Sequence, residues 1–157
     1  MDKKAILKKA FPFKGLSEEV LADISEIFAE DNAVGGDLLF SEGEKADKVY
    51  CVVMGSMRLM KKNRSGEDEE VGILGTGAFF GEIAGLLEDS ERSVSAVVSE
   101  PSRYISCNFS DLASYFEKNP AQGMTFYRNI SVGIAKRLKI VNRDVSFLKT
   151  FVKERHQ

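Results

Sequence analysis

The chain has few of the residues on which most metal and redox chemistry depends. Its 157 residues include one histidine, His156, which is the penultimate residue, and two cysteines. Chain ends are usually poorly ordered, so a histidine-bound metal or haem is not expected. Cys51 and Cys107 lie in separate apolar runs without CxxC spacing, which favours two small buried thiols over a disulfide or a metal site. A lone terminal histidine also leaves no Ser-His or Cys-His pair to assemble, so we do not expect an enzyme.

The chain also lacks a long apolar run and a strong excess of charge of either sign. No stretch approaches the length of a membrane-spanning helix, and the lysine-rich start, residues 1–10, lacks the apolar region of a secretory signal. We therefore expect a soluble cytoplasmic protein. Lys and Arg number 22 against 24 Asp and Glu, and the net charge of −2 gives no electrostatic reason to expect a nucleic-acid partner.

The length suits a single domain, residues 1–157, that is mainly β with flanking α-helices. Ser17, followed by two acids, predicts a helix start within an N-terminal helical segment, residues 11–34. Over 35–109, short β-rich runs punctuated by glycine predict an antiparallel β jelly roll, also called a double-stranded β-helix. The expected strands are 38–40, 49–54, 57–62, 69–74, 94–98 and 103–108, and the turns at 63–66 and 75–77 fit tight antiparallel connections.

Helices are expected again over 110–152. A short helix should run from Ser110 to about Lys118, and Asn119 and Pro120 then supply the cap and first position of a long final helix, 120–152. Apolar residues step along that helix by three or four, namely Tyr127, Ile130, Ile134, Leu138, Val141, Val145, Leu148 and Val152.

This apolar stripe predicts a homodimer through helix 120–152, because it continues for more than three heptads. The alternative is that the stripe only covers the chain's own barrel. The basic residues of the helix are interpreted as the solvated face of the coiled coil rather than a DNA contact, and they are Lys136, Arg137, Lys139 and Arg143. Lys61 and Lys62 are interpreted in the same way, as solvated charges of a hairpin.

The segment 79–93, FFGEIAGLLEDSERS, carries the chemistry of a candidate anion site. A phosphate diester is best held by a guanidinium together with free backbone N–H groups at a helix start, and Arg92 and the turn near Gly81 supply these. Gly81 also lets the backbone approach a ligand closely. Glu82 can accept a hydrogen bond from a ribose hydroxyl. Taken alone, Arg92 could instead be a surface residue paired with Glu88 or Glu91, and Glu82 a helix-start acid.

Two linked stretches carry a family resemblance. The segment 79–93 resembles the phosphate-binding cassette of cyclic nucleotide-binding domains, as found in catabolite activator proteins, kinase A regulatory subunits and nucleotide-gated channels. Upstream, residues 36–59 are similar to that family's strand-turn-strand segment, with matches at Gly36-Asp37, Glu42-Gly43-Glu44, Ala46-Asp47, Tyr50 and Gly55. The resemblance covers residues from about Phe11 to about Leu148.

The resemblance implies a set of ligand contacts. It places the exocyclic phosphate oxygen on Arg92, the ribose 2′-hydroxyl on Glu82, and a further hydroxyl contact on Ser93. Backbone amides near Gly81, Ile83 and Ala84 would complete the cradle. Gly85 departs from the family, which usually has a larger apolar residue there, and a glycine should loosen the short helix.

The resemblance is less informative about the base. Activator proteins place a threonine and a serine of the long helix on the adenine amino group, and the corresponding positions here are Val141 and Asn142. Valine cannot form that hydrogen bond, whereas Asn142 can donate or accept. Cyclic AMP is therefore the favoured ligand, and cyclic GMP stays open.

Our functional hypothesis is a cyclic nucleotide sensor that signals through its C-terminal helix to a downstream protein still to be identified. The alternative is a dimeric protein-interaction module of the same fold that has lost its ligand. Activator proteins carry a helix-turn-helix domain after this helix, whereas this chain stops at Gln157. We therefore expect no DNA-binding domain in this chain, which is either a stand-alone sensor or a piece of a longer regulator.

Overall fold

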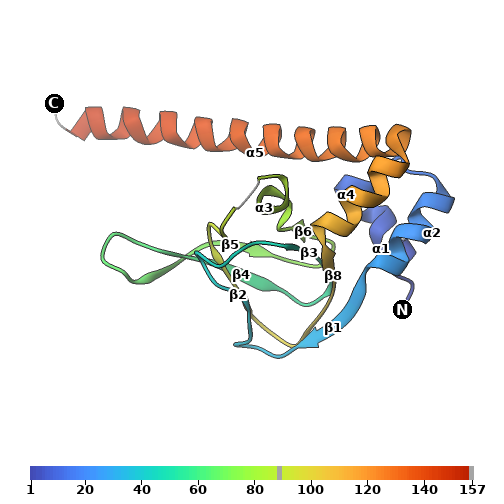
Figure 1. Cartoon of the computed structure of the whole chain (residues 1–157). Coiled ribbons are helices and arrows are strands. Elements are labelled where there is room, and N and C mark those ends of the chain that lie inside the picture. Colours follow the sequence, from blue (N-terminus) through green and yellow to red (C-terminus); the bar gives the residue numbers. More distant parts are fainter. Residues whose placement is uncertain (88–89, 156–157) are drawn as a thin grey trace.

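The computed structural model describes residues 1–87 and 90–155, apart from the side chains of Ala84, Thr150, Glu154 and Arg155. The chain opens with α1 (Lys3–Lys9), the short η1 (Phe11–Phe13) and α2 (Glu18–Ile27). The strands are β1 (Ala29–Ala33), β2 (Leu38–Phe40), β3 (Lys48–Met54), β4 (Met57–Lys62), β5 (Asp68–Leu74), β6 (Phe79–Phe80), β7 (Ser95–Val98) and β8 (Ser102–Asn108). Helix α3 (Glu82–Leu86) lies between β6 and β7, and α4 (Phe109–Lys118) and α5 (Pro120–Arg155) follow (Figure 1).

The strands form two four-stranded antiparallel sheets. One sheet has the order β1-β8-β3-β6 and the other β2-β7-β4-β5, so neighbours in a sheet are mostly distant in sequence. This arrangement is the predicted jelly roll, with helices at one end (Figure 1). The predicted strands 38–40 and 57–62 are confirmed as given, and the other four are confirmed to within one residue at either end.

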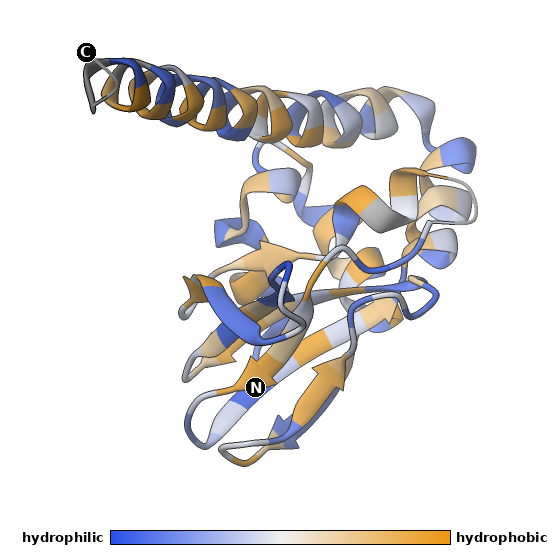
Figure 2. Cartoon of the chain, turned by 90° about the vertical axis from the view of Figure 1, so that its left-hand side faces the viewer, coloured by the Kyte–Doolittle hydropathy of each residue, from blue (hydrophilic) through white to orange (hydrophobic). Residues whose placement is uncertain are grey.

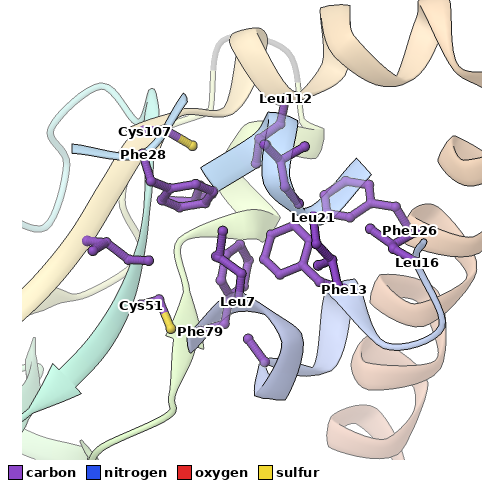
Figure 3. Packing of buried hydrophobic residues seen from close by; sticks show 14 of the residues in the cluster. Leu7, Phe13, Leu16, Leu21, Phe28, Cys51, Phe79, Cys107, Leu112 and Phe126 are labelled. Carbon is purple, nitrogen blue, oxygen red and sulfur yellow. The ribbon is translucent and has the colours of Figure 1, made fainter. Parts of the chain in front are cut away.

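Strand β3 separates two hydrophobic cores because its side chains alternate between its faces. Tyr50 and Val52 point into the barrel between the sheets, whereas Val49 and Cys51 pack against the helices. The helical core is rich in aromatic rings, and in Figure 3 the ring of Phe13 lies between Phe79 of β6 and Phe126 of α5. Phe126 stacks on Phe116 with the ring centroids 4.4 Å apart, which ties α5 to α4.

Both cysteines belong to the helical core as free thiols, which confirms the interpretation as small buried residues. Burial raises the pKa of the Cys51 thiol to about 11. Burial also raises the pKa of Cys107, and the charge of Asp111 adds to that shift. Both thiols are therefore protonated at neutral pH, which makes them poor nucleophiles and metal ligands. The third residue of the metal argument, His156, lies outside the described residues.

The helix starts follow the predicted chemistry with one difference. Ser17 caps α2 by accepting a hydrogen bond from the N–H of Val20, and Pro120 is the first residue of α5 as predicted. The Asn119 side chain, however, donates to the carbonyl of Tyr115, 3.0 Å away. It therefore closes the end of α4 rather than capping the free amides of α5.

Two further expectations are corrected, and two elements were not predicted. Residues 29–33 form β1 rather than part of a helical segment, because they pair antiparallel with β8 despite their polar sequence. The turn at 75–77 joins β5 to β6, which belong to different sheets, so it is not an antiparallel hairpin connection. Helix α1 and the two-residue strand β6 were not predicted, because neither is long enough to show a hydrophobic period.

Helix α5 runs along the molecule above the barrel, and its C-terminal end passes the last of the strands (Figure 1). Its first turns are buried, with Phe126 and Ile130 almost fully covered. Apolar and polar residues then alternate along its outer part (Figure 2), where Leu138, Val141, Val145, Leu148 and Val152 are each at least 44% exposed. The chain's own barrel therefore covers only the first part of the stripe. Among the described residues, no helix is long and apolar enough to cross a membrane.

Replacing Phe126 tests whether the aromatic stack anchors α5. We expect Phe126→Ala to lower the free energy of unfolding by about 3–5 kcal/mol, because a fully buried ring leaves a cavity. Met124 lies two residues away and is 74% exposed, so Met124→Ala should change stability by less than about 0.5 kcal/mol. Urea unfolding followed by circular dichroism measures both. Equal effects of the two substitutions would show that α5 is not anchored by this ring.

Candidate functional site

A cavity of about 300 Å³ opens between α3, the strand end at Phe40 and helix α5. The volume falls at the small end of the range of about 300–1,000 Å³ that is typical of ligand sites. Its lining combines an apolar majority with two buried charged residues, Glu82 and Arg92. The lining residues are Phe40, Leu59, Phe80, Gly81, Glu82, Ile83, Leu87, Ser90, Glu91, Arg92, Ser93, Val94 and Arg137.

Arg92 is 5% exposed, and its guanidinium lies inside the barrel wall. The guanidinium carbon lies 4.1 Å from the centroid of the Phe40 ring, and Nη2 donates to the carbonyl of Lys48 at 2.7 Å. Its Nε is buried without a hydrogen-bond partner among the described residues. Burial lowers the pKa of Arg92, and Tyr50 and Asp47 oppose that shift, yet an arginine stays charged at neutral pH. The site therefore holds a desolvated cation with unused donor capacity.

Hydrogen bonds fix residues 90–92, at the end of the cassette, to the upstream loop, residues 41–46. The Arg92 N–H donates to the carbonyl of Glu44, and the Arg92 carbonyl accepts from Gly43, both at 2.8 Å. The N–H of Ala46 also donates to the carbonyl of Ser90. These bonds explain why the two motif stretches occur together, since the upstream loop holds the cassette arm in place.

Lys61 is a residue whose role sequence reasoning missed. Its ammonium group donates to the carbonyl of Ser93 at 2.8 Å and pairs with Glu42 at 3.0 Å. Glu42 in turn accepts from the N–H of Lys62 at 3.0 Å. Lys61 thus links β4 to the end of the cassette, and it is not merely a solvated hairpin charge.

Gly81 begins α3 from a left-handed conformation, with φ +94°, that disfavours any other residue. A Cβ at this position would lie 2.7 Å from the carbonyl oxygen of Lys48 and 3.0 Å from Nη1 of Arg92. The glycine therefore lets the cassette backbone pass directly beside the guanidinium. Gly81 provides no side-chain cap, so the first amides of α3, including that of Ile83, keep their donor capacity.

Glu82 is the first residue of α3, and its side chain is 1% exposed although it is an acid. Its carboxylate accepts a hydrogen bond from Nη2 of Arg137, which reaches it from α5 and also forms an ion pair with it. The Arg137 guanidinium carbon lies 5.8 Å from the centroid of the Phe11 ring. The expectation that Arg137 belongs to a solvated face is therefore incomplete, because the side chain is 48% exposed but also pairs with the buried Glu82. The sequence held one signal of this contact. Arg137 follows the buried Ile130 by 7 residues, a spacing that puts both residues on the same side of a helix, here the barrel side of α5.

The remaining predicted residues divide between the cavity and α5. Ser93 and Ile83 line the cavity, and the backbone of Ala84 lies in α3, although its side chain is outside the described residues. Asn142 and Val141 are exposed on α5 and do not line the cavity in a single chain. Of the two alternative partners of Arg92, Glu88 lies outside the described residues, and no hydrogen bond or ion pair links Arg92 to Glu91.

Gly85 has a packing role that the sequence did not reveal. A Cβ on Gly85 would lie 2.3 Å from Cγ of Phe109, the first residue of α4. The missing side chain lets α3 lie directly on that ring, so the glycine brings the cassette close to the helical core. The expected loosening of the short helix stays a prediction.

The geometry brings an unsatisfied buried cation and a buried carboxylate to the same cavity, with the amides at the start of α3 beside them. Such a set can bind an anion through the guanidinium and the amides and a hydroxyl group through the carboxylate. The exposed apolar side chains of Ile83 and Leu87 provide a surface for a flat ring. Among the described residues there is no group of three or more metal-binding side chains.

Comparison with known proteins now identifies the family. A family model described as the cyclic nucleotide-binding domain matches residues 32–119, more than half of the chain. The chain belongs to this family. It is 26% identical over 136 residues to the cyclic AMP receptor protein of Thermus thermophilus, which covers 87% of this chain and 61% of that protein. It is also 29% identical over 102 residues to a cGMP-dependent protein kinase of Drosophila melanogaster, covering 64% of this chain and 11% of the kinase.

Solved structures agree with this assignment. The catabolite activator protein of Thermus thermophilus superposes with a TM-score of 0.78 at 26% identity, covering 89% of this chain and 63% of that one. The regulatory domain of Toxoplasma gondii PKA, solved with cAMP, shares the fold with a TM-score of 0.65 at 24% identity, covering 71% of this chain and 42% of that one. This chain spans less than two thirds of the length of each of these four proteins.

Two glycines with similar backbone conformations test the role of Gly81. Gly81 has φ +94° and Gly77 has φ +85°, but a Cβ on Gly77 would meet nothing within 4 Å. Both alanine substitutions carry the same backbone strain, so Gly81→Ala should weaken cyclic nucleotide binding at least about tenfold more than Gly77→Ala does. Fluorescence titration with a cyclic AMP analogue measures the difference. Equal losses would mean that the close approach beside Arg92 does not matter for binding.

Proposed function

We propose that this protein is a sensor that binds a 3′,5′-cyclic nucleotide, preferably cyclic AMP, and transmits its occupancy through α5. The observation that carries the proposal is the buried Arg92, whose Nε lacks a partner, in the same cavity as the buried Glu82. An unpaired buried donor on a cation costs free energy, and an incoming phosphate would remove that cost. The resemblance of residues 36–59 and 79–93 to the family's binding segments supports the same assignment.

In the proposed complex, each part of the nucleotide meets a group that suits it. The cyclic phosphate accepts hydrogen bonds from Arg92 and from the amides of Ile83 and Ala84, beside Gly81. The ribose 2′-hydroxyl donates to Glu82, and Ser93 adds a hydroxyl contact. None of these contacts requires bond making or breaking, and a non-enzymatic role follows from the proposal.

Transmission to α5 is proposed to run through Arg137. A ribose hydroxyl that donates to Glu82 either competes with the guanidinium of Arg137 for the carboxylate or adds to the hydrogen bonds that hold this guanidinium and carboxylate together. Either way the nucleotide has a differential interaction with two positions of α5, which is what a ligand needs to shift an equilibrium. The Glu82–Arg137 pair is the contact on which this step depends.

Base preference and dimer formation belong to the same proposal. Asn142 is exposed on α5, 5 residues beyond Arg137, so it can meet a base only if α5, from the same or a second chain, moves over the cavity. A homodimer through 120–152 would cover the exposed stripe from Leu138 to Val152. Similarity to a cyclic AMP receptor over more of the chain than to a cGMP-dependent kinase supports adenine.

The competing function is a dimeric interaction module that no longer binds a nucleotide. The contact between Glu82 and Arg137 favours it to some extent, because the carboxylate already has a partner without any ligand. The unpartnered Nε of Arg92 weighs against the interaction module, because a site that binds no ligand gains nothing from a buried cation with an unused hydrogen-bond donor. A cytoplasmic location and a downstream protein partner remain predictions under either function.

Calorimetric titration separates the two functions. We expect micromolar or tighter binding of cyclic AMP, weaker binding of cyclic GMP, and a loss of at least about a hundredfold for Arg92→Ala, since the substitution removes a charge-assisted contact to phosphate. Arg64 lies in an exposed turn between β4 and β5, so Arg64→Ala is the matched control and should bind normally. No heat with either nucleotide, at concentrations far above micromolar, would favour the interaction module.

Hydrogen–deuterium exchange tests transmission through Arg137. Cyclic AMP should change the exchange of backbone amides in residues 134–145 of the unaltered protein, and Arg137→Ala should abolish at least half of that change while still binding nucleotide. Among the described residues Arg143 forms an ion pair with its neighbour Asp144 alone, at 3.7 Å, and Arg143→Ala is the control. A full response in the Arg137→Ala protein would remove the Glu82–Arg137 pair from the mechanism.

Sedimentation velocity tests the dimer. Introducing Val141→Glu together with Leu148→Glu places charge in the exposed apolar stripe, and we expect the dimer to dissociate by at least about tenfold in Kd. Lys139→Glu together with Ser146→Glu alters exposed positions of the same helix outside the stripe and should leave the dimer intact. A protein that sediments as a monomer before any substitution contradicts the predicted dimer.

A further inference from the structure

A second groove lies along α5 and shares no lining residue with the nucleotide cavity. It has a volume of about 390 Å³ and runs between η1 and the first half of α5, which hydrogen bonds from Asn129 hold together. The residues that line it are Phe11, Lys14, Arg128, Asn129, Val132, Gly133 and Lys136. None of these described lining residues is acidic.

The groove carries three exposed cations. Arg128 and Lys136 lie on α5 eight residues apart, and Val132 lies midway between them. Arg128, Val132 and Lys136 therefore form one row along the helix. Lys14 faces this row from the end of η1. In the part of the chain that the structure describes, none of the side chains of these three residues forms a hydrogen bond or an ion pair. Their charges are therefore available to a partner in a protein whose net charge is −2.

The groove is also held in a fixed shape. The Asn129 side chain donates to the carbonyls of Pro12 and Lys14, at 3.0 and 2.8 Å, and so fastens η1 to α5. A Cβ on Gly133 would lie 2.7 Å from Cε2 of Phe11, so this glycine lets the ring lie against the helix. The site is thus pre-organised, which lowers the entropic cost of binding.

We propose that this groove binds an acidic segment of a partner protein, with an apolar side chain of that segment set on Val132 and Phe11. Charge complementarity selects an acidic partner. The apolar floor favours a peptide over the headgroups of a membrane or the phosphates of a nucleic acid, because neither of those would use the 45% exposed Val132. The inference extends the proposed function by naming the class of its downstream partner, but the groove itself needs no nucleotide.

Phe11 connects the groove to the nucleotide cavity. One part of its ring lies in the groove, and its centroid is 5.8 Å from the guanidinium carbon of Arg137, the residue that pairs with Glu82. A ligand that alters the position of Arg137 therefore acts on the wall of the groove. By thermodynamic linkage, nucleotide binding and peptide binding should change each other's affinity by the same factor.

Fluorescence anisotropy with a defined probe tests the groove. The probe is a fluorescein-labelled synthetic peptide of glutamate with interspersed leucine, and the reference probe has lysine in place of glutamate. We expect the acidic probe to bind, the basic probe not to bind, and Arg128→Glu together with Lys136→Glu to weaken binding at least about tenfold. Lys139→Glu together with Arg143→Glu makes the same change of charge on α5 outside the groove and should bind nearly normally. Val132→Ser should also weaken binding of the acidic probe.

Several outcomes would overturn the proposal. Equal losses in the groove variant and the control variant would show only a general response to charge. Stronger groove-dependent binding to phosphatidylserine vesicles or to a DNA duplex, with Val132→Ser having no effect, would assign the groove to a polyanion instead. Calorimetry with cyclic AMP on the Arg128→Glu, Lys136→Glu protein keeps the two hypotheses separate, because nucleotide binding that persists while peptide binding fails rejects only one of them. Circular dichroism confirms that each variant is folded.

Discussion

The guanidinium of Arg92 lies where a charge is costly to keep, inside the wall of a jelly roll and against the ring of Phe40. The fold compensates part of that cost with the carbonyl of Lys48 and the neighbouring ring, and it leaves Nε unsatisfied. The rest of the cassette is arranged around this side chain. Gly81 allows the backbone to pass beside it, and the loop at 43–44 fixes its main chain on both sides.

The second constraint is the burial of Glu82, because a carboxylate at 1% exposure needs a partner. Arg137 supplies it from α5, a helix that starts 27 residues after the cassette ends at Ser93. This pair joins the cassette to α5, which otherwise touches the protein through its first turns around Phe126 and Ile130. A short polar contact near the middle of a long helix is well placed to report on a ligand, because it can be exchanged without unpacking a hydrophobic core.

The sequence predicted the features that follow from local patterns. Glycine-punctuated β runs indicated the jelly roll, Ser17 and Pro120 marked helix starts, and the motif around Glu82 and Arg92 placed both side chains in the cavity. It missed what depends on tertiary pairing. The polar strand β1 exists only because β8 pairs with it, and Gly85 is explained only by the ring of Phe109 beneath it. Arg137 and Lys61 were interpreted as solvated charges because their partners, Glu82 and Ser93, are distant in the sequence and are brought near only by the fold.

We propose different ligands for the two hollows along α5, a nucleotide for one and an acidic partner for the other, with Phe11 and Arg137 between them. The central claim concerns the first side, and a crystal structure grown with cyclic AMP tests it most directly. The account predicts the cyclic phosphate within hydrogen-bond distance of the Arg92 guanidinium and the ribose 2′-hydroxyl on the Glu82 carboxylate. A cavity that stays empty at saturating nucleotide, or a nucleotide bound away from Arg92, would contradict it.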